Sequence, residues 1–311
     1  MPVASRFTEP EGWQWGKIIP REGQFLRYGF VSPGHPKGLV FVLPGLSEYI
    51  EKYYETVHDL MDRGFAAVVI DWRGQGHSWR QLKDYARHHD SFDNDIADAF
   101  TLINIICVDQ ALAGLPKIML AHSMGAHIGL GILHDRPGLF SCAVMNTPMQ
   151  GINMAFDGTA FQRCLAEILN LMIGTRLTSS PWSEEKFVKQ QDILTSDPDR
   201  RALKIQHMHD DPGLRSGPVT YGWVNAALRS MHKMNNPAYL KTIQTPILIT
   251  IAGQEKVVSN RAIHYLAANL PDATTIDIPG ALHEILMERD QFRSQFWHAF
   301  DGFVAKHVQA G

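Results

Sequence analysis

The sequence predicts an α/β fold in which a mostly parallel sheet is covered by helices on both faces. Three observations predict it: short apolar, β-branched runs that end at turns, helical spacing of apolar residues between these runs, and regular alternation of the two patterns. Such alternation is typical of parallel sheets, because a helical crossover returns the chain to the starting edge of the sheet. For 311 residues we expect one core with one insertion.

The elements of the core follow in order along the chain. The run GLVFVL at 38–43 ends at a Pro-Gly turn and predicts a buried strand, and the helical pattern after it is ended by Gly64. The same reasoning predicts strands over 38–43, 66–70, 118–121, 142–145, 246–251 and 273–278, and helices over 50–63, 95–112, 124–134, 261–270 and 290–306.

The alternation breaks between the fourth and fifth of these strands. After Asn146 the chain has helical fragments, Pro, Gly and Ser, but no recognisable buried strand. We predict a helical cap over 147–235, with core segments 1–146 and 236–311. Cap residues such as Met149, Trp182 and Trp223 are interpreted either as packing inside the cap or as contacts for a substrate in the cleft that the cap covers. Contact of the cap with a lipid surface is also open.

Composition narrows the classes of function. The net charge of −3 and the absence of a long basic run argue against nucleic-acid binding. Three irregularly spaced cysteines argue against a disulfide framework and a CxxC metal site, so we expect reduced, buried thiols. We find neither a secretory leader nor an apolar run of about 18 residues. The expected location is therefore the cytoplasm, with peripheral contact at the inner membrane left open.

Ser123 is the candidate nucleophile. It lies in AHSMG, between a predicted strand and a predicted helix, where a sharp turn exposes the hydroxyl and aims free backbone N–H groups at a developing oxyanion. The usual pattern is G-x-S-x-G, and Ala121 replaces the first glycine. The alternative interpretation of Ser123 is an ordinary helix N-cap.

A serine nucleophile needs a base and a group that orients the base. His283 follows the last predicted strand in the loop PGALHE and is the candidate base. Glu255 is the only carboxylate in the loop after strand 246–251 and is the candidate acid, although it is also interpretable as a surface carboxylate beside Lys256. Asp277 and Asp71 remain open as acids.

The oxyanion needs two donors. We assign them to the backbone N–H groups of Leu46, in the loop LPGLSE, and Met124. Pro44 in that loop lacks an N–H and only shapes the turn. The glycines of DWRGQGHS are interpreted as structural, because the segment lacks the spacing and lysine of a phosphate-binding loop.

Five motifs taken in order resemble bacterial lysophospholipases and monoacylglycerol-lipase-like members of the α/β-hydrolase superfamily: PGLSEYIEKYYE, DWRGQGHS, AHSMGAHIGL, AGQEKVVSN and GALHEILMERD. The resemblance spans about residues 25–305. It implies the α/β-hydrolase fold with a helical cap inserted after the sixth strand, acyl-ester substrates such as monoacyl lipids, and no metal or organic cofactor. Three departures are Ala121 for glycine, Pro44 for the usual histidine, and Glu255 where many members have aspartate.

The resulting hypothesis is a serine hydrolase that cleaves carboxylic esters through an acyl-enzyme, of lysophospholipase or monoacylglycerol-lipase type. A peptidase or amidase with the same triad is one alternative, because ester and amide cleavage share the acyl-enzyme route. A catalytically silent ligand-binding protein with this fold is the other. Haloalkane and epoxide chemistry are disfavoured, because both need an aspartate where Ser123 stands.

Overall fold

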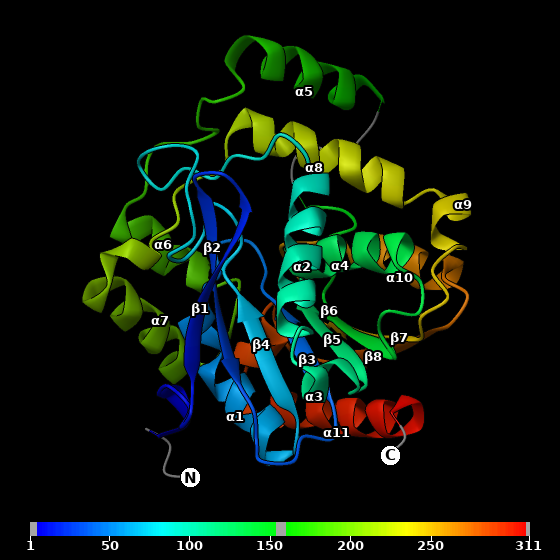
Figure 1. Cartoon of the computed structure of the whole chain (residues 1–311). Coiled ribbons are helices and arrows are strands. Elements are labelled where there is room, and N and C mark those ends of the chain that lie inside the picture. The colour runs from blue at the N-terminus through cyan, green and yellow to red at the C-terminus, as the bar shows by residue number, and fades with distance from the viewer. Residues whose placement is uncertain (1–4, 154–159, 309–311) are drawn as a thin grey trace.

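The computed structural model describes residues 5–153 and 160–308, and in this part of the chain eight strands form one sheet (Figure 1). The spatial order is β1-β2-β4-β3-β5-β6-β7-β8. The pairs β1–β2 and β2–β4 are antiparallel and all other neighbours are parallel, which confirms the predicted sheet. The strands are β1 (Gln14–Arg21), β2 (Gln24–Val31), β3 (Leu39–Leu43), β4 (Ala66–Ile70), β5 (Lys117–His122), β6 (Cys142–Asn146), β7 (Ile247–Ala252) and β8 (Ala273–Ile278).

Helices cover both faces of the sheet (Figure 1). Side chains alternate along β3: Leu39, Phe41 and Leu43 face one hydrophobic cluster, while Val40 and Val42 face the other. The first cluster is covered by α2 (Asp93–Ile106), α4 (Met124–Asp135), α8 (Tyr221–Met234), α9 (Pro237–Leu240) and α10 (Asn260–Asn269), and the second by α1 (Tyr54–Asp62) and α11 (Asp290–His307). The shorter elements are η1 (Ser5–Phe7), η2 (Ile50–Tyr53), α3 (Gln110–Ala113), η3 (Pro212–Leu214) and η4 (Ile285–Met287).

Three expectations about the elements need correction. The single helix predicted over 95–112 is wrong, because α2 ends at Ile106 and α3 is separate. The hairpin β1–β2 and the helix α7 (Pro198–Asp210) were not predicted at all. The other predicted core strands and helices are present, with bounds that shift by at most four residues.

The segment predicted as a cap lies between the sixth and seventh strands and contains α5 (Ala160–Ile173), α6 (Glu184–Gln191), α7 and α8, which we refer to as the cap. In Figure 1, α5 and α8 lie over one end of the core, and α6 and α7 lie beside it. Helix α7 is joined to the core by buried charges. Arg200 donates two hydrogen bonds of 2.7 Å to Glu55 on α1, and both side chains are buried.

Candidate active site

Ser123 lies in a strained turn between β5 and α4. Its backbone has φ 49° and ψ −111°, a conformation that is unfavourable for any residue except glycine. The next turn of the chain is held close to β3, because a Cβ on Gly125 would lie 2.1 Å from the carbonyl oxygen of Leu43. The sharp strand-to-helix turn expected around Ser123 is therefore present, and only glycine fits at position 125.

Ala121 explains why the departure from the usual pentapeptide is tolerated. It lies inside β5, pairs with Leu43 on one side and Met145 on the other, and does not have a positive φ. Its side chain is buried. An L-residue with a methyl group therefore meets no backbone penalty at this position, in contrast to positions 123 and 125.

His283 joins the two other predicted triad side chains. Its Nε2 lies 3.0 Å from the hydroxyl oxygen of Ser123, and its Nδ1 lies 2.7 Å from Oε2 of Glu255. Ser123 and His283 are both buried. The structure thus brings together three residues that lie up to 160 positions apart in the sequence, in the order and spacing that a nucleophile, a base and an orienting acid require.

The loop after β7 holds the carboxylate of Glu255 at both oxygens. Oε1 accepts hydrogen bonds from the backbone N–H groups of Val257 and Val258, at 2.7 and 3.2 Å, and Oε2 faces His283. Burial alone would raise the pKa of Glu255. The hydrogen bond and charge of His283, together with the two N–H groups, outweigh burial and hold this pKa below its ordinary value. Glu255 is therefore an anion at neutral pH.

The structure places the other two candidate acids elsewhere. Asp71 is buried, accepts hydrogen bonds from Arg27 at 2.6 Å and from the N–H groups of Ile50 and His77, and so organises the loop after β4. Asp277 is exposed on the edge strand β8. Neither makes a hydrogen bond to His283 in the described residues. The sequence DWRGQGHS is thus a structural segment built around Asp71.

Two backbone N–H groups are free for an oxyanion. In the described ranges, neither Leu46 N–H nor Met124 N–H has a hydrogen-bond acceptor. Met124 is the first residue of α4, where the N–H groups point out of the helix. A Cβ at position 125 would lie 2.1 and 2.5 Å from the carbonyl oxygens of Leu43 and Pro44, so the two segments lie close together.

The protein family follows from a comparison with known proteins. Residues 34–290 match the family model described as serine aminopeptidase, S33. The chain belongs to this family. Among the curated proteins, lysophospholipase L2 of Escherichia coli K12 is 31% identical to this chain over 88% of this chain and 82% of its own length. Human monoglyceride lipase is 25% identical over 94% of this chain and 90% of its own length.

Solved structures show the same fold. A soluble variant of monoglyceride lipase from Saccharomyces cerevisiae, in complex with a substrate analogue, superimposes with a TM-score of 0.77 over 97% of both chains at 17% identity. A carboxyl esterase from Bacillus coagulans gives a TM-score of 0.76 over 96% of this chain and 100% of its own, also at 17% identity. The predicted α/β-hydrolase fold is confirmed.

In this S33 family member, one residue outside the prediction supports the loop that carries Leu46. Gln75 accepts a hydrogen bond from Ser47 N–H at 2.8 Å and donates to the carbonyl oxygens of Gly45 and Glu48, at 3.0 and 3.3 Å. These bonds fix the loop that carries Leu46. Gln75 lies in a segment interpreted as structural, and only the contact with residues 45–48 reveals its link to the site.

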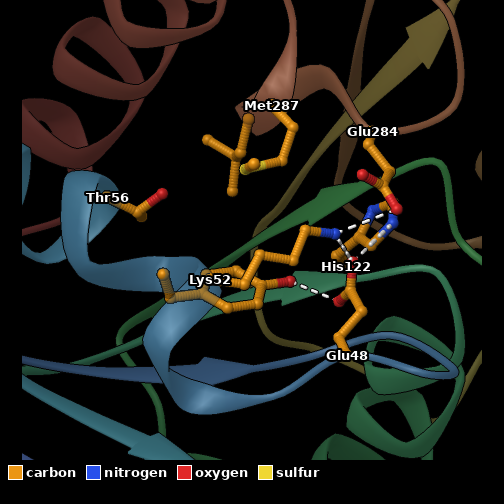
Figure 2. A pocket seen from close by; sticks show the side chains of 8 residues that line it. Glu48, Lys52, Thr56, His122, Glu284 and Met287 are labelled. Carbon is orange, nitrogen blue, oxygen red and sulfur yellow. Dashed lines mark hydrogen bonds and ion pairs between the residues drawn. The ribbon is translucent and has the colours of Figure 1, made fainter. Parts of the chain in front are cut away.

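A buried charge cluster behind His283 was also not predicted. Figure 2 shows Lys52 between Glu48 and Glu284, with His122 beside them. The rings of His122 and His283 lie 4.8 Å apart. Burial lowers the pKa of His122 to about 4, so this imidazole is neutral at neutral pH. Burial alone would raise the pKa of Glu284, but Lys204 of α7 and Lys52 hold it well below its ordinary range.

The cap residues considered for substrate contact lie in different surroundings. Met149 is buried, and its N–H donates to the carbonyl oxygen of Ser123 at 3.1 Å. Trp223 packs in the main core, 6.0 Å from the ring of Phe92. Trp182 is partly buried under Arg215, whose guanidinium carbon lies 4.4 Å from the indole centroid. Only Met149 is tied directly to the nucleophile turn.

Other kinds of site find little support in the ranges 5–153 and 160–308. No group of three or more His, Cys, Asp or Glu side chains there is arranged to hold a metal ion. Cys107 and Cys142 are free thiols, and the side chain of Cys164 lies outside the described residues. No described helix combines the length and apolar character needed to cross a bilayer.

Proposed function

We propose that this protein is a serine carboxylic-ester hydrolase that acts on monoacyl lipids through an acyl-enzyme. The observation that carries the proposal is the position of His283, which contacts the Ser123 hydroxyl and the Glu255 carboxylate through its two ring nitrogens. Held in this way, the imidazole of His283 can accept the serine proton at Nε2.

In the first half of the reaction, Ser123 Oγ attacks the ester carbonyl while His283 Nε2 takes its proton. Glu255 orients the ring and stabilises the imidazolium that forms. The N–H groups of Leu46 and Met124 stabilise the tetrahedral oxyanion. His283 then donates the proton to the leaving alcohol, the bond between the carbonyl carbon and the alcohol oxygen breaks, and the acyl group remains on Ser123.

The second half repeats these steps with water. His283 accepts a proton from water, the resulting hydroxide attacks the acyl-enzyme carbonyl, and the same two N–H groups hold the oxyanion. Collapse of this intermediate returns the proton to Ser123 and releases a fatty acid. No cofactor or metal takes part in these steps.

Two considerations support a monoacyl lipid as the substrate. The family relatives with high coverage bear the names lysophospholipase and monoglyceride lipase. Met149, whose N–H bonds to the Ser123 carbonyl, is an apolar residue packed in the core beside the nucleophile turn, so the surroundings of Ser123 include an apolar side chain.

The test combines labelling with a substrate panel. We expect a fluorophosphonate probe to label the wild-type protein but not Ser123→Ala, and this variant to lose several orders of magnitude in kcat/KM. The panel compares esters of rising chain length with an aminoacyl anilide, because the family description names an aminopeptidase. Faster anilide than ester turnover would favour a peptidase, and absence of labelling would favour a silent binding protein.

We also propose that the cap contacts lipid surfaces through α5. Leu171 and Met172 are 86% and 76% exposed, and Ile168 is 49% exposed. Exposed apolar side chains on one helix are typical of contact sites. We expect Leu171→Ser/Met172→Ser to reduce co-sedimentation with anionic liposomes. The matched control is Val108→Ser, which removes a 77% exposed apolar side chain outside the cap. Equal binding of all three proteins would contradict the proposal.

A further inference from the structure

Three arginines at the seam between the cap and the core lack acidic partners. Within the described part of the chain, no carboxylate lies at ion-pair distance from Arg80, Arg87 or Arg215. The other buried or largely buried arginines behave differently, because each pairs with at least one carboxylate: Arg27, Arg73, Arg200 and Arg293. The seam therefore holds three guanidinium groups without a paired carboxylate, in a protein whose net charge is −3.

Two of the three arginines have other roles in the fold. Arg80 donates hydrogen bonds to the carbonyl oxygens of Gly74 and Gly76 in the core, at 2.6 and 2.8 Å, and of Gly213 and Arg215 in the cap, at 3.1 and 3.2 Å. Arg215 stacks on Trp182 and donates to the carbonyl oxygen of Met208. Both side chains hold the cap on the core.

Arg87 is the exception. In the described residues, its guanidinium makes one hydrogen bond, from Nη1 to the hydroxyl oxygen of Ser47. Its Nε is buried and has no acceptor. Burial and the nearby charge of Arg80 lower the pKa of Arg87 to about 9, so the side chain is still a cation at neutral pH. Arg87 is half-buried, and a partly desolvated cation without an anion is unfavourable, which is why arginines in such positions usually have an ionic partner.

The backbone places Arg87 between the cap and the oxyanion loop. Arg87 N–H donates to the carbonyl oxygen of Pro218, and its own carbonyl accepts from Thr220 N–H at 3.0 Å, so this segment is paired with the cap. Its side chain reaches Ser47, the residue after Leu46. The cation therefore lies beside the loop that carries a proposed oxyanion donor.

The free donors match one ligand chemistry. A guanidinium offers parallel N–H groups that fit two oxygens of a phosphate, and its bonds to phosphate are among the stronger hydrogen bonds in proteins. In a lysophospholipid, a glycerol backbone joins the ester to the phosphate. An ester carbonyl bound by Leu46 N–H therefore keeps the phosphate within a short reach of this loop.

We propose that Arg87, oriented by Ser47, binds the phosphodiester head group of a lysophospholipid whose ester lies at Ser123. The inference rests on the proposed function and names its substrate: a monoacyl lipid with a phosphate is preferred to a neutral monoacylglycerol. Arg87 then is a specificity residue, and the phosphate supplies the anion that the seam lacks.

The test measures a specificity ratio. We compare kcat/KM for lysophosphatidylethanolamine with kcat/KM for the monoacylglycerol of the same acyl chain. Arg87→Met removes a charge-assisted hydrogen bond, so we expect it to lower the ratio about 10- to 100-fold. Arg87→Lys keeps the charge but lacks the parallel N–H groups of the guanidinium, so it should lower the ratio less. Arg261→Met, which removes an exposed arginine on α10, is the matched control and should keep the wild-type ratio. An unchanged ratio in both Arg87 variants would overturn the inference.

Competition separates a head-group site from a site for free phosphate. With a p-nitrophenyl ester as substrate, we expect glycerophosphoethanolamine to inhibit the wild-type protein more strongly than inorganic phosphate, and to inhibit Arg87→Met more weakly. Equal inhibition of wild type and Arg87→Met would overturn the inference. Fluorophosphonate labelling of Ser123 and an unchanged Tm verify that each variant is folded.

The two proposals fail in different ways. If the wild-type protein hydrolyses neither lipid nor the p-nitrophenyl ester, the proposed function is wrong. If it hydrolyses esters and the Arg87 variants keep its specificity ratio, only the assignment of the phosphate site is wrong.

Discussion

Lys204 of the cap helix α7 donates hydrogen bonds to both carboxylate oxygens of Glu284, at 3.0 and 2.9 Å, and Glu284 directly follows His283. All three side chains are buried. A cation from the cap therefore holds the chain next to the proposed catalytic base, and Lys52 contacts the same carboxylate from the core at 2.9 Å.

The first prediction concerns this ion pair. In Lys204→Met, the carboxylate of Glu284 has one buried cation, Lys52, in place of two. We therefore expect a loss of about 3–5 kcal/mol in the free energy of unfolding. Lys204→Met/Glu284→Gln should lose less than the sum of the single variants, because the excess charge is gone. Lys233→Met breaks an exposed pair with Asp93 and should cost about 1 kcal/mol or less. Denaturant unfolding of Lys204→Met, Glu284→Gln, the double variant and Lys233→Met measures these free energies. Additive effects of the substitutions at Lys204 and Glu284 would contradict a coupling between the two side chains.

The second prediction concerns the length and charge of the acid. Because Glu255 Oε1 is held by Val257 and Val258, its side chain must span from that anchor to His283. Glu255→Asp should lower kcat about 10- to 100-fold, and Glu255→Gln by about 10³-fold or more through loss of the charge that orients the imidazole. Asp277→Asn, at an exposed position on β8, is the control. A larger loss in Asp277→Asn than in Glu255→Gln would identify a different acid.

The third prediction concerns the oxyanion loop. Gln75→Leu removes the hydrogen bonds to Gly45, Ser47 and Glu48, so the N–H of Leu46 is no longer held in place. Oxyanion donors act mainly in the transition state, so we expect kcat to fall about 10- to 100-fold with little change in KM. Gln206→Leu, at an exposed pair with Asp210, serves as the control. A rise in KM at constant kcat would show that Gln75 acts on substrate binding.

The fourth prediction concerns stability in acid. Burial lowers the pKa values of His122 and His127 from 6.5 to about 4. Between these pH values the unfolded chain binds protons that the folded chain does not, so stability is full above pH 6.5 and falls as the pH drops toward 4. Each histidine contributes up to about 1.4 kcal/mol per pH unit. Thermal unfolding between pH 4.5 and 7 should show a steep fall in Tm.

Variants assign this slope to the histidines. His127 is buried between Ser230 and Gln150. His127→Gln should flatten the dependence of Tm on pH, whereas His35→Gln, at an exposed position, should keep it. The same slope in both variants would mean that other groups govern the acid transition.

Most of the fold was predictable because buried parallel strands appear in the sequence as short runs of apolar residues. All five residues of β3, β4 and β6 are buried, so each appears as an apolar run. Strand β1 at the sheet edge has one fully buried residue, Ile18, and its sequence therefore lacks a hydrophobic pattern. Helix α7 was missed for a different reason. Its buried stripe is Arg200, Lys204 and Met208, so helical spacing is present but two of the three side chains are cations.

The residues of the candidate site also fall into a group that the sequence predicts and a group that it does not. Ser123, Glu255 and His283 each follow a strand with a clear pattern, and the topology of parallel strands brings such loops to one edge. No comparable sequence pattern points to Gln75, Glu284 or Arg87. Their importance comes from contacts across long stretches of chain, with residues 45–48, Lys204 and Ser47, which the sequence does not encode locally.

The buried charges of α7 restrict how the enzyme opens. Swinging this helix outward would separate Glu55 from the guanidinium of Arg200 and Glu284 from the ammonium of Lys204, and breaking such buried ion pairs is costly. This half of the cap is therefore fixed to the core. The opposite half of the cap, where α5 lies against α8, has no buried ion pair to the core among the described residues of α5, so a hinge that admits a long acyl tail is expected there.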